Sequence, residues 1–344
     1  MAYTDIDDPS AYFQTKTYAG TDASPQAFTL DGNSDLQPDW VWIKNRGYAN
    51  KHVVFDSVRG VEKSLTTNST AVEVNQNADG GYLSAFNSDG FTLTEGSGSD
   101  NDTNDNRYTY VAWNWKKTAD AGFDIVLYTG NATNRTIAHS CGSVPTMIIT
   151  TDRAGNNWFV YHVGMGNTKM IKLNQTNAEE AKAEIWNQTT PTASVFTLGT
   201  DNDANEDGNS FVAYLFSDVQ GYSKMGSYTG NNNTDGPFVY TGFKPAWIMI
   251  KRTGTANTAT NMNGSHWVIL DNKRDPVNGG TAAALTANRT TAEDTSNLTD
   301  VEFLSNGFKF RGGADAVNAE DTYIYMAFAE NPLVTSKGVP ATAF

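Results

Sequence analysis

The sequence of 344 residues has a single cysteine, Cys141, so an intrachain disulfide cannot form. The fold must therefore be held by packing, together with any bound ions or partner subunits. Basic residues are scarce as well, with 24 Lys and Arg against 38 Asp and Glu and a formal net charge of −14. A phosphate backbone would be repelled by such a chain, so nucleic-acid binding is not expected.

Long apolar runs are missing too. No window approaches the roughly 18 uninterrupted apolar residues of a membrane span, so no membrane insertion is expected. The chain opens with Met1 and Ala-Tyr-Thr-Asp-Ile-Asp-Asp, which lacks the positive start and apolar core of a secretory signal. We expect a protein that is made in a cytoplasm without a signal peptide.

Catalytic motifs are absent from the sequence. It contains no G-x-S-x-G elbow, no H-E-x-x-H helix, no phosphate-binding P-loop and no G-x-G-x-x-G after a strand. Its four histidines are dispersed, and a structural role is the simpler interpretation of each; they are His52, His139, His162 and His266. We therefore expect no enzyme, no catalytic residue and no organic cofactor.

What the sequence does contain is the same frame three times. Each frame has a Tyr-x-Gly triplet, an apolar strand beginning with proline, a Phe-x-Leu or Phe-x-Phe triplet and an aromatic strand. The prolines are Pro38, Pro145 and Pro245, so the steps are 107 residues (145 − 38) and 100 residues (245 − 145). The repeat is far longer than the roughly 20 to 50 residues of a solenoid unit, which makes each frame domain-sized.

Strand patterns dominate each frame. Apolar runs rich in Val, Ile, Tyr, Phe and Trp alternate with clusters of Asn, Asp, Gly, Ser and Thr. At roughly 100 residues per frame, we expect an all-β fold of three tandem, packed β-sandwiches of the jelly-roll or lectin-like kind, with seven to nine strands each. The expected segments are an N-terminal docking segment (1–11), three sandwich repeats (12–117, 122–217 and 225–331) and a C-terminal tail (332–344).

The strand after each proline indicates how the repeats pack. Trp40 and Trp42 point one way, and Val41 and Ile43 point the other, so this strand should be covered on both faces. The linkers between repeats are short, which favours repeats packed against each other in a fixed arrangement. The aligned aromatic strands are taken as Tyr110–Trp113, Phe211–Tyr214 and Tyr325–Phe328, and Thr150 is taken as the counterpart of Lys44 and Lys251. Asn177–Trp186 is the one short helix expected.

Three strings carry a resemblance to a known family: Ile6–Gln14, Asp35–Arg46 with its Pro-Asp-Trp-Val-Trp-Ile-Lys-Asn-Arg core, and Gly226–Phe243. They resemble the repeated domains of virion surface proteins of marine tailed bacteriophages, which are described as tail-fibre-like or virion structural proteins. The similarity spans essentially the whole chain. It implies a place on the virion surface and a homotrimer as one candidate assembly, with pseudo-threefold packing of the repeats within one chain as the alternative. The acidic, turn-rich start and the proline-punctuated end could each dock on another virion protein as an extended peptide, and the alternative is that both ends are frayed.

Recurring charged and aromatic residues supply the candidate sites. Asp56 with Arg59, and Asp271 with Arg274, fit a turn pinned by a carboxylate, and the alternative is an exposed arginine that captures an acidic ligand. Trp186, beside polar residues, is the best candidate for an exposed platform that stacks on a sugar. Core packing is expected for the tryptophans within apolar strands; these are Trp40, Trp42, Trp113, Trp115 and Trp247.

The acidic loop before the last strand of the second frame suggests calcium. It alternates oxygen-bearing side chains, as a six- to eight-oxygen Ca²⁺ shell requires, and the alternative is a solvated loop. The candidate ligands are Asp201, Asp203, Asn205 and Asp207. Similar loops occur at 100–105 and 315–321.

Three functions remain open at this point. The leading hypothesis is a non-enzymatic bacteriophage virion structural protein in a tail fibre or appendage that contacts a host receptor or surface glycan. The first alternative is a capsid decoration or head-fibre protein. The second is a carbohydrate-binding, lectin-like module.

Overall fold

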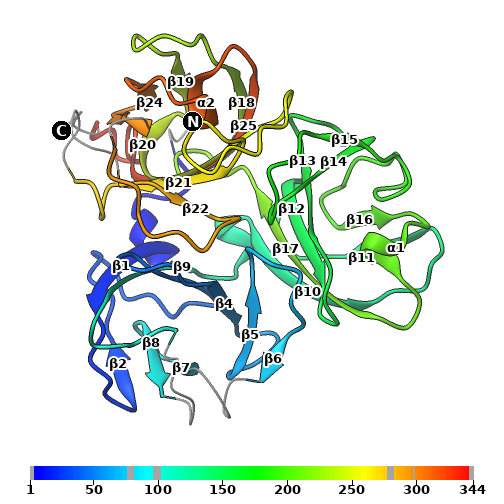
Figure 1. Cartoon of the computed structure of the whole chain (residues 1–344), viewed down its shortest axis with the longest axis horizontal. Helices are drawn as coiled ribbons and strands as arrows, with labels where there is room; N and C mark the ends of the chain where they lie inside the picture. The colour runs from blue at the N-terminus through cyan, green and yellow to red at the C-terminus, as the bar shows by residue number, and fades with distance from the viewer. Residues whose placement is uncertain (1–3, 76–80, 96–101, 277–282, 297–298, 341–344) are drawn as a thin grey trace.

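The computed structural model describes residues 4–75, 81–95, 102–276, 283–296 and 299–340. Antiparallel strands form three large sheets, each with a smaller sheet packed on its peripheral side (Figure 1). This confirms the expected all-β sandwich fold. Within those ranges, the only α-helices are the four-residue α1 (Asn202–Asn205) and α2 (Asp315–Asn318).

The first unit, blue to cyan in Figure 1, contains β1 to β9. Its large sheet has the order β1-β9-β3-β4-β5-β6, and β2-β8-β7 form the small sheet. The strands are β1 (Phe13–Ala19), β2 (Gln26–Phe28), β3 (Trp40–Asn45), β4 (His52–Asp56), β5 (Lys63–Thr66), β6 (Val74–Asn75), β7 (Tyr82–Phe86), β8 (Phe91–Thr94) and β9 (Thr109–Trp115).

The second unit, mainly green, contains β10 to β17. The order of its large sheet, β10-β17-β12-β13-β14-β15, matches that of the first unit, and β11-β16 form the small sheet. The strands are β10 (Phe123–Thr129), β11 (Arg135–Ala138), β12 (Pro145–Asp152), β13 (Trp158–His162), β14 (Lys169–Lys172), β15 (Glu180–Ala181), β16 (Val195–Leu198) and β17 (Ser210–Ser217).

The third unit, yellow to red, contains β18 to β25. Its large sheet has the order β18-β25-β20-β21-β22, and β19-β24-β23 form the small sheet. The strands are β18 (Ser223–Thr229), β19 (Phe238–Tyr240), β20 (Phe243–Arg252), β21 (Trp267–Asp271), β22 (Leu285–Thr286), β23 (Val301–Leu304), β24 (Gly307–Phe310) and β25 (Thr322–Pro332).

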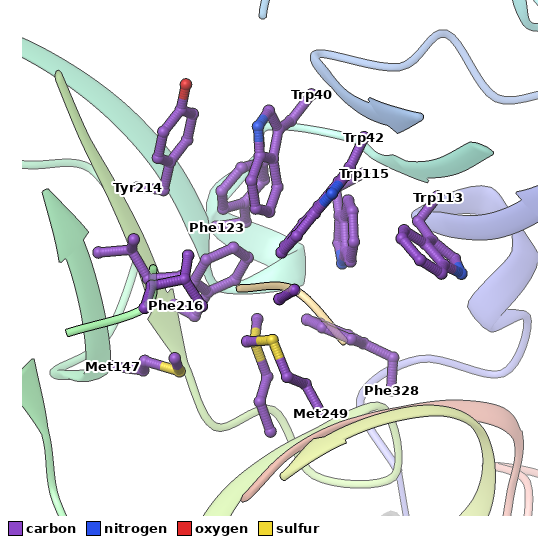
Figure 2. Close-up of a cluster of buried hydrophobic side chains, with 14 of the residues drawn as sticks. Trp40, Trp42, Trp113, Trp115, Phe123, Met147, Tyr214, Phe216, Met249 and Phe328 are labelled. Atoms are coloured by element: carbon purple, nitrogen blue, oxygen red, sulfur yellow. The ribbon is translucent and has the colours of Figure 1, made fainter. Parts of the chain in front are cut away.

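One face of every large sheet contributes to a single central core. Trp40, Trp42, Trp113 and Trp115 from the first unit meet residues of the other two units there (Figure 2). The central partners include Phe123, Met147, Tyr214 and Phe216 from the second unit and Trp247, Met249 and Phe328 from the third. The five tryptophans expected in the core are all buried here.

The other face of each large sheet packs against the unit's own small sheet. Val41 and Ile43 lie in the core of the first unit, Ile148 in that of the second and Ile248 in that of the third. Alternate residues of one strand therefore serve two cores. This is the physical reason that the strand after the proline is apolar on both faces, as the sequence predicts.

The strand register corrects two expected alignments. The last strand of each large sheet pairs with the strand after the proline at equivalent positions, which are Trp115 with Trp40, Phe216 with Met147 and Phe328 with Trp247. The counterpart of Tyr110–Trp113 in the third unit is therefore Tyr323–Met326 and not Tyr325–Phe328. The shift is two residues, which leaves the assignment of faces unchanged.

Counting along β12 in the same register, Thr151 and not Thr150 matches Lys44 and Lys251. Both lysines are buried and donate to backbone carbonyls, Lys44 to Asn45 at 2.7 Å and Lys251 to Ser265. Both lysines are therefore structural residues and are not available for a surface contact.

The helix expected at 177–186 is not formed, because Glu180–Ala181 pair with β14 as the short strand β15. The backbone N–H of Glu179 meanwhile donates to the carbonyl of Thr253 in the third unit. Tertiary pairing has overridden the helix propensity of this segment.

The N-terminal segment folds back on its own chain. Ile6 is 5% exposed and belongs to the central core, and the N–H of Asp5 donates to the carbonyl of Gln220. Asp7 accepts a 2.6 Å hydrogen bond from the N–H of Ser336 near the other end. Docking of the terminal segments on another protein stays a prediction.

Candidate functional site

Equivalent backbone contacts join the three units in a cycle. The N–H of Glu73 donates to Arg153 in the second unit, that of Glu179 to Thr253 in the third, and that of Glu293 to Arg46 in the first, at 2.9, 2.9 and 2.8 Å. Each contact leads from one unit to the next, and the third returns to the first. The three units therefore form a closed ring within one chain.

A second set of contacts runs around the ring in the opposite sense. Trp158 Nε1 donates to the carbonyl of Thr66 at 3.0 Å, and Trp267 Nε1 donates to that of Lys172 at 2.8 Å. His52 holds the equivalent position in the first unit and lies near the backbone of Thr286, but its Nε2 does not reach hydrogen-bond geometry.

Buried charged side chains reinforce the contact between the first and second units. Asp56 accepts from Arg59 and from the hydroxyl of Tyr214, and the side chains of Asp56 and Arg59 are fully buried. Arg59 also contacts Glu73 at 3.1 Å, and Glu73 accepts from Arg153 at 2.6 and 2.8 Å. Burial would raise the pKa of Glu73, but the hydrogen bond from Arg153 and the charge of Arg59 outweigh it and lower that pKa.

The contact between the third and first units repeats this cluster. Asp271 accepts from Arg274 at 2.6 Å and from Trp113 Nε1 at 2.9 Å. Arg274 contacts Glu293 at 3.1 Å, and Arg46 from the first unit donates to both oxygens of Glu293 at 2.9 Å.

The interpretation of Asp56 with Arg59 and of Asp271 with Arg274 as pinned turns is right. The alternative of surface recognition by Arg59 and Arg274 is wrong, because neither side chain is exposed. Sequence reasoning missed Arg46, Arg153, Glu73 and Glu293, which complete the two clusters. The only available signal was that Arg46 and Arg153 both follow the proline strand at the same distance.

The contact between the second and third units lacks such a cluster. His162 stands where the other units have Asp56 and Asp271, and it contacts the carbonyl of Tyr325 through Nε2 at 3.1 Å. Burial lowers the pKa of His162 to about 4, although the bond to Tyr325 opposes the shift. Thr253 replaces the arginine that pairs across the interface in the other two contacts.

The Tyr-x-Gly triplets hold the acidic loops. The hydroxyls of Tyr18, Tyr128 and Tyr228 donate to the carbonyls of Thr103, Ala204 and Val317 at 2.6 to 2.8 Å. The residue after each of these carbonyls is a buried asparagine whose side-chain oxygen accepts from the backbone after the triplet; the three are Asn104, Asn205 and Asn318. The glycine of the triplet is needed because an added Cβ would lie about 2 Å from a carbonyl oxygen, for example 2.0 Å from Glu206 at Gly130.

The proposed calcium ligands do not form one site. Asp201 and Asp203 both contact Lys182, Asn205 directs its amide nitrogen to the carbonyls of Thr133 and Gly199, and Asp207 is exposed. Across the described ranges, no group of three or more His, Cys, Asp or Glu side chains could hold a metal ion. The oxygen-rich spacing reflects a loop capped by Asp201 and pinned by Asn205. Asp100 and Asn101 of the first similar loop lie outside the described residues.

Trp186 is not an exposed platform. Its side chain is 2% exposed, packs edge-on to Tyr161 and donates through Nε1 to the carbonyl of Lys169 at 3.2 Å. The polar neighbours that suggested exposure lie in the turn that follows. Trp186 is thus part of the core of the second unit.

A polar pocket of about 360 Å³ lies where the second and third units meet. Residues 174–177 of the second unit line one side, and Thr258, Thr260 and Arg289 of the third unit are among the residues on the other. The pocket depends on the connection 253–266 between β20 and β21, which is longer than the equivalent connections 46–51 and 153–157.

Part of the pocket lining is fixed by hydrogen bonds. His266 Nε2 faces the carbonyl of Ala259 at 2.9 Å, and its Nδ1 faces the amide of Asn288 at 3.0 Å. A proton on Nε2 satisfies both contacts, so the ring is neutral in this arrangement. Burial lowers the pKa of His266 to about 4, which agrees with the neutral ring that the hydrogen bonds require.

These features define a class: an all-β protein in which three sandwich units close into a ring around one aromatic core. Residues 8–332 match the family described as Domain of unknown function (DUF7483), and the chain belongs to that family. A search of curated proteins gave no match. No helix among the described residues is long and apolar enough to cross a membrane.

Proposed function

We propose that the chain is a non-enzymatic structural protein of a bacteriophage particle, displayed on the virion surface in a tail fibre or another appendage that contacts the host cell. The observation that carries the proposal is the closed ring. Three units share one buried core and two buried ion clusters, so they form a rigid body with its connecting loops on the outside. Rigid bodies that present loops are the usual scaffold of recognition proteins.

The buried charged side chains of the described residues support a structural role. Several buried titratable groups are paired with one another or with the backbone, as in the clusters around Asp56 and Asp271 and at His162. Such pairing commits these groups to the contacts between units. The resemblance of Asp35–Arg46 to phage virion proteins supplies the biological setting of the proposal.

A head decoration or head-fibre protein is the alternative within the particle. The terminal segments would then bind the capsid, and the loops would matter less. The third candidate, a lectin-like module, is favoured by one specific observation, the polar pocket beside Arg289.

Immunogold electron microscopy of intact particles, with an antibody raised against the recombinant chain, tests the proposal. Label on the tail or on a projecting fibre is the expected result. Label spread over the head would contradict a role in host contact and favour capsid decoration. Particles without label, together with absence of the chain from their protein content by mass spectrometry, would overturn the virion assignment.

A further inference from the structure

Arg289 differs from every other arginine of the chain. Of the nine arginines in the sequence, eight donate to a carboxylate or to a backbone carbonyl. The guanidinium of Arg289 makes no hydrogen bond or ion pair with any described residue, although the side chain is half-buried. Burial lowers the pKa of Arg289, and Asp294 only partly offsets that effect without forming an ion pair.

An arginine in this state favours an anionic partner. A guanidinium remains protonated in proteins, so partial burial without a counter-ion is an unfavourable state that a bound anion relieves. Its planar fork fits the two oxygens of a carboxylate better than it fits a point charge. The nearby carboxylates of the second unit are already paired, Glu179 with Lys169 and Glu180 with Lys172, and neither forms an ion pair with Arg289.

The remaining walls of the pocket suit hydroxyl groups. Thr176, Thr258 and Thr260 line it, and none of their hydroxyls bonds to a described residue. Gln175 and Asn177 donate to Asn157 and Glu180 through their nitrogens, which leaves their amide oxygens as acceptors. The volume of about 360 Å³ lies within the usual range of small-molecule sites. Hydroxyls and amides around one cation form a lining that matches a polyhydroxylated ligand with a single carboxylate.

We propose that this pocket binds a carboxylate-bearing sugar residue, as in a uronate-containing glycan, with the carboxylate on Arg289 and the sugar hydroxyls on the threonines and amides. The inference deepens the proposed host contact by naming a class of surface ligand. The binding itself is a property of the isolated chain, so it stands or falls separately from the location on a particle.

Isothermal titration of the full chain with trigalacturonate, and with the neutral galactose trisaccharide of the same stereochemistry, tests the proposal. We expect binding of the acidic sugar and at least about tenfold weaker binding of the neutral one, because a charge-assisted bidentate contact is lost. Arg289→Gln should weaken trigalacturonate binding by a similar factor. Arg135→Gln is the matched control, since Arg135 is also partly buried but lies outside the pocket, where its side chain donates to the carbonyl of Thr129.

The outcomes separate the parts of the inference. Equal binding of both sugars, or unchanged binding by Arg289→Gln, would overturn the role of Arg289. Failure of the folded chain to bind trigalacturonate at millimolar concentration would overturn the site. Displacement of the sugar by equimolar acetate or sulfate would show that the pocket binds anions in general and would overturn the proposed recognition of a sugar. A variant with Thr258 and Thr260 both changed to Val, with an unchanged melting temperature, should lose affinity for the sugar but not for sulfate.

Discussion

The hydroxyl of Tyr214 donates to Oδ2 of Asp56 at 2.7 Å, although the two residues are 158 positions apart. Asp56 also receives Arg59, so its buried carboxylate is shared between two units of the ring. The equivalent carboxylate of Asp271 receives Trp113 from the first unit and Arg274 from its own. Two of the three contacts between units thus contain a buried carboxylate that accepts hydrogen bonds from both units.

Removal of Arg59 should therefore destabilise the whole ring. Arg59→Met leaves Asp56 buried without its cation, and the expected loss is about 3–5 kcal/mol in the free energy of unfolding. Chemical denaturation followed by tryptophan fluorescence measures it. Arg107→Gln removes an ion pair with Asp105 in which the arginine is largely exposed and should leave the midpoint unchanged. Equal midpoints for the two variants would contradict the proposed role of the cluster.

The glycine of the Tyr-x-Gly triplet should tolerate no side chain. In Gly130→Ala, the added Cβ would lie 2.0 Å from the carbonyl oxygen of Glu206, so the loop must move, at an expected cost of about 1–3 kcal/mol. Gly313 has no atom within 4 Å of an added Cβ, which makes Gly313→Ala the matched control with an effect within about 0.5 kcal/mol. Thermal unfolding by calorimetry compares the two. A tolerated Gly130→Ala would show that the loop adjusts freely.

Trp186 should behave as a core residue in mutagenesis. Trp186→Ala removes a fully packed indole from the core of the second unit, and the expected cost is about 3–5 kcal/mol. A melting temperature equal to that of the unchanged chain would instead place this tryptophan at the surface. Near-ultraviolet circular dichroism gives an independent measure, because the signal of an immobilised indole should disappear.

Acid should weaken the fold through its buried histidines. Burial holds the pKa of His162 and of His266 at about 4 and that of His52 well below its usual value of 6.5. In the unfolded chain these residues take up protons below about pH 6.5, whereas in the folded chain His162 and His266 do not do so until about pH 4. Their contribution to stability is therefore complete above pH 6.5 and is lost as the pH falls between those values. For His162 the slope is about 1.4 kcal/mol per pH unit.

Melting temperatures measured from pH 7.5 to pH 4.5 check this dependence. His162→Gln lowers stability at every pH, but it should reduce the difference between the two ends of the range because one proton fewer is taken up on unfolding. The control is Arg107→Gln, which should leave the difference as it is. A flat profile for the unchanged chain would contradict the neutral, buried state of these histidines.

The main architecture could be predicted because successive side chains of a strand point to opposite faces of the sheet, so the pattern of apolar residues shows which faces are covered. Trp40 and Trp42 against Val41 and Ile43 implied two covered faces, and the structure supplies a separate core for each. The same periodicity explains the error at Tyr325–Phe328. In the run Tyr323 to Phe328, a shift of two residues retains both faces, and only the pairing with β20 fixes the register.

The candidate sites were harder to predict because burial depends on contacts that are distant in the sequence. Arg59 looks like a surface arginine until the neighbouring unit places Tyr214 on Asp56 and Arg153 on Glu73, the second carboxylate that Arg59 contacts. The acidic loop at Asp201 looks like a cation loop until Lys182 is placed beside it. Arg289 carries no local signal at all, since its distinguishing property is the lack of a partner in three dimensions.

The longer connection 253–266 occurs in one unit of the three, and it is this asymmetry that a covalently linked ring permits. A ring of three identical chains would repeat every loop three times, so any change in one loop would appear at all three positions. In a single chain, each third can diverge while the common centre is preserved. Each chain would therefore offer a single Arg289 pocket to a receptor, and tight attachment would require several copies of the whole chain on one particle.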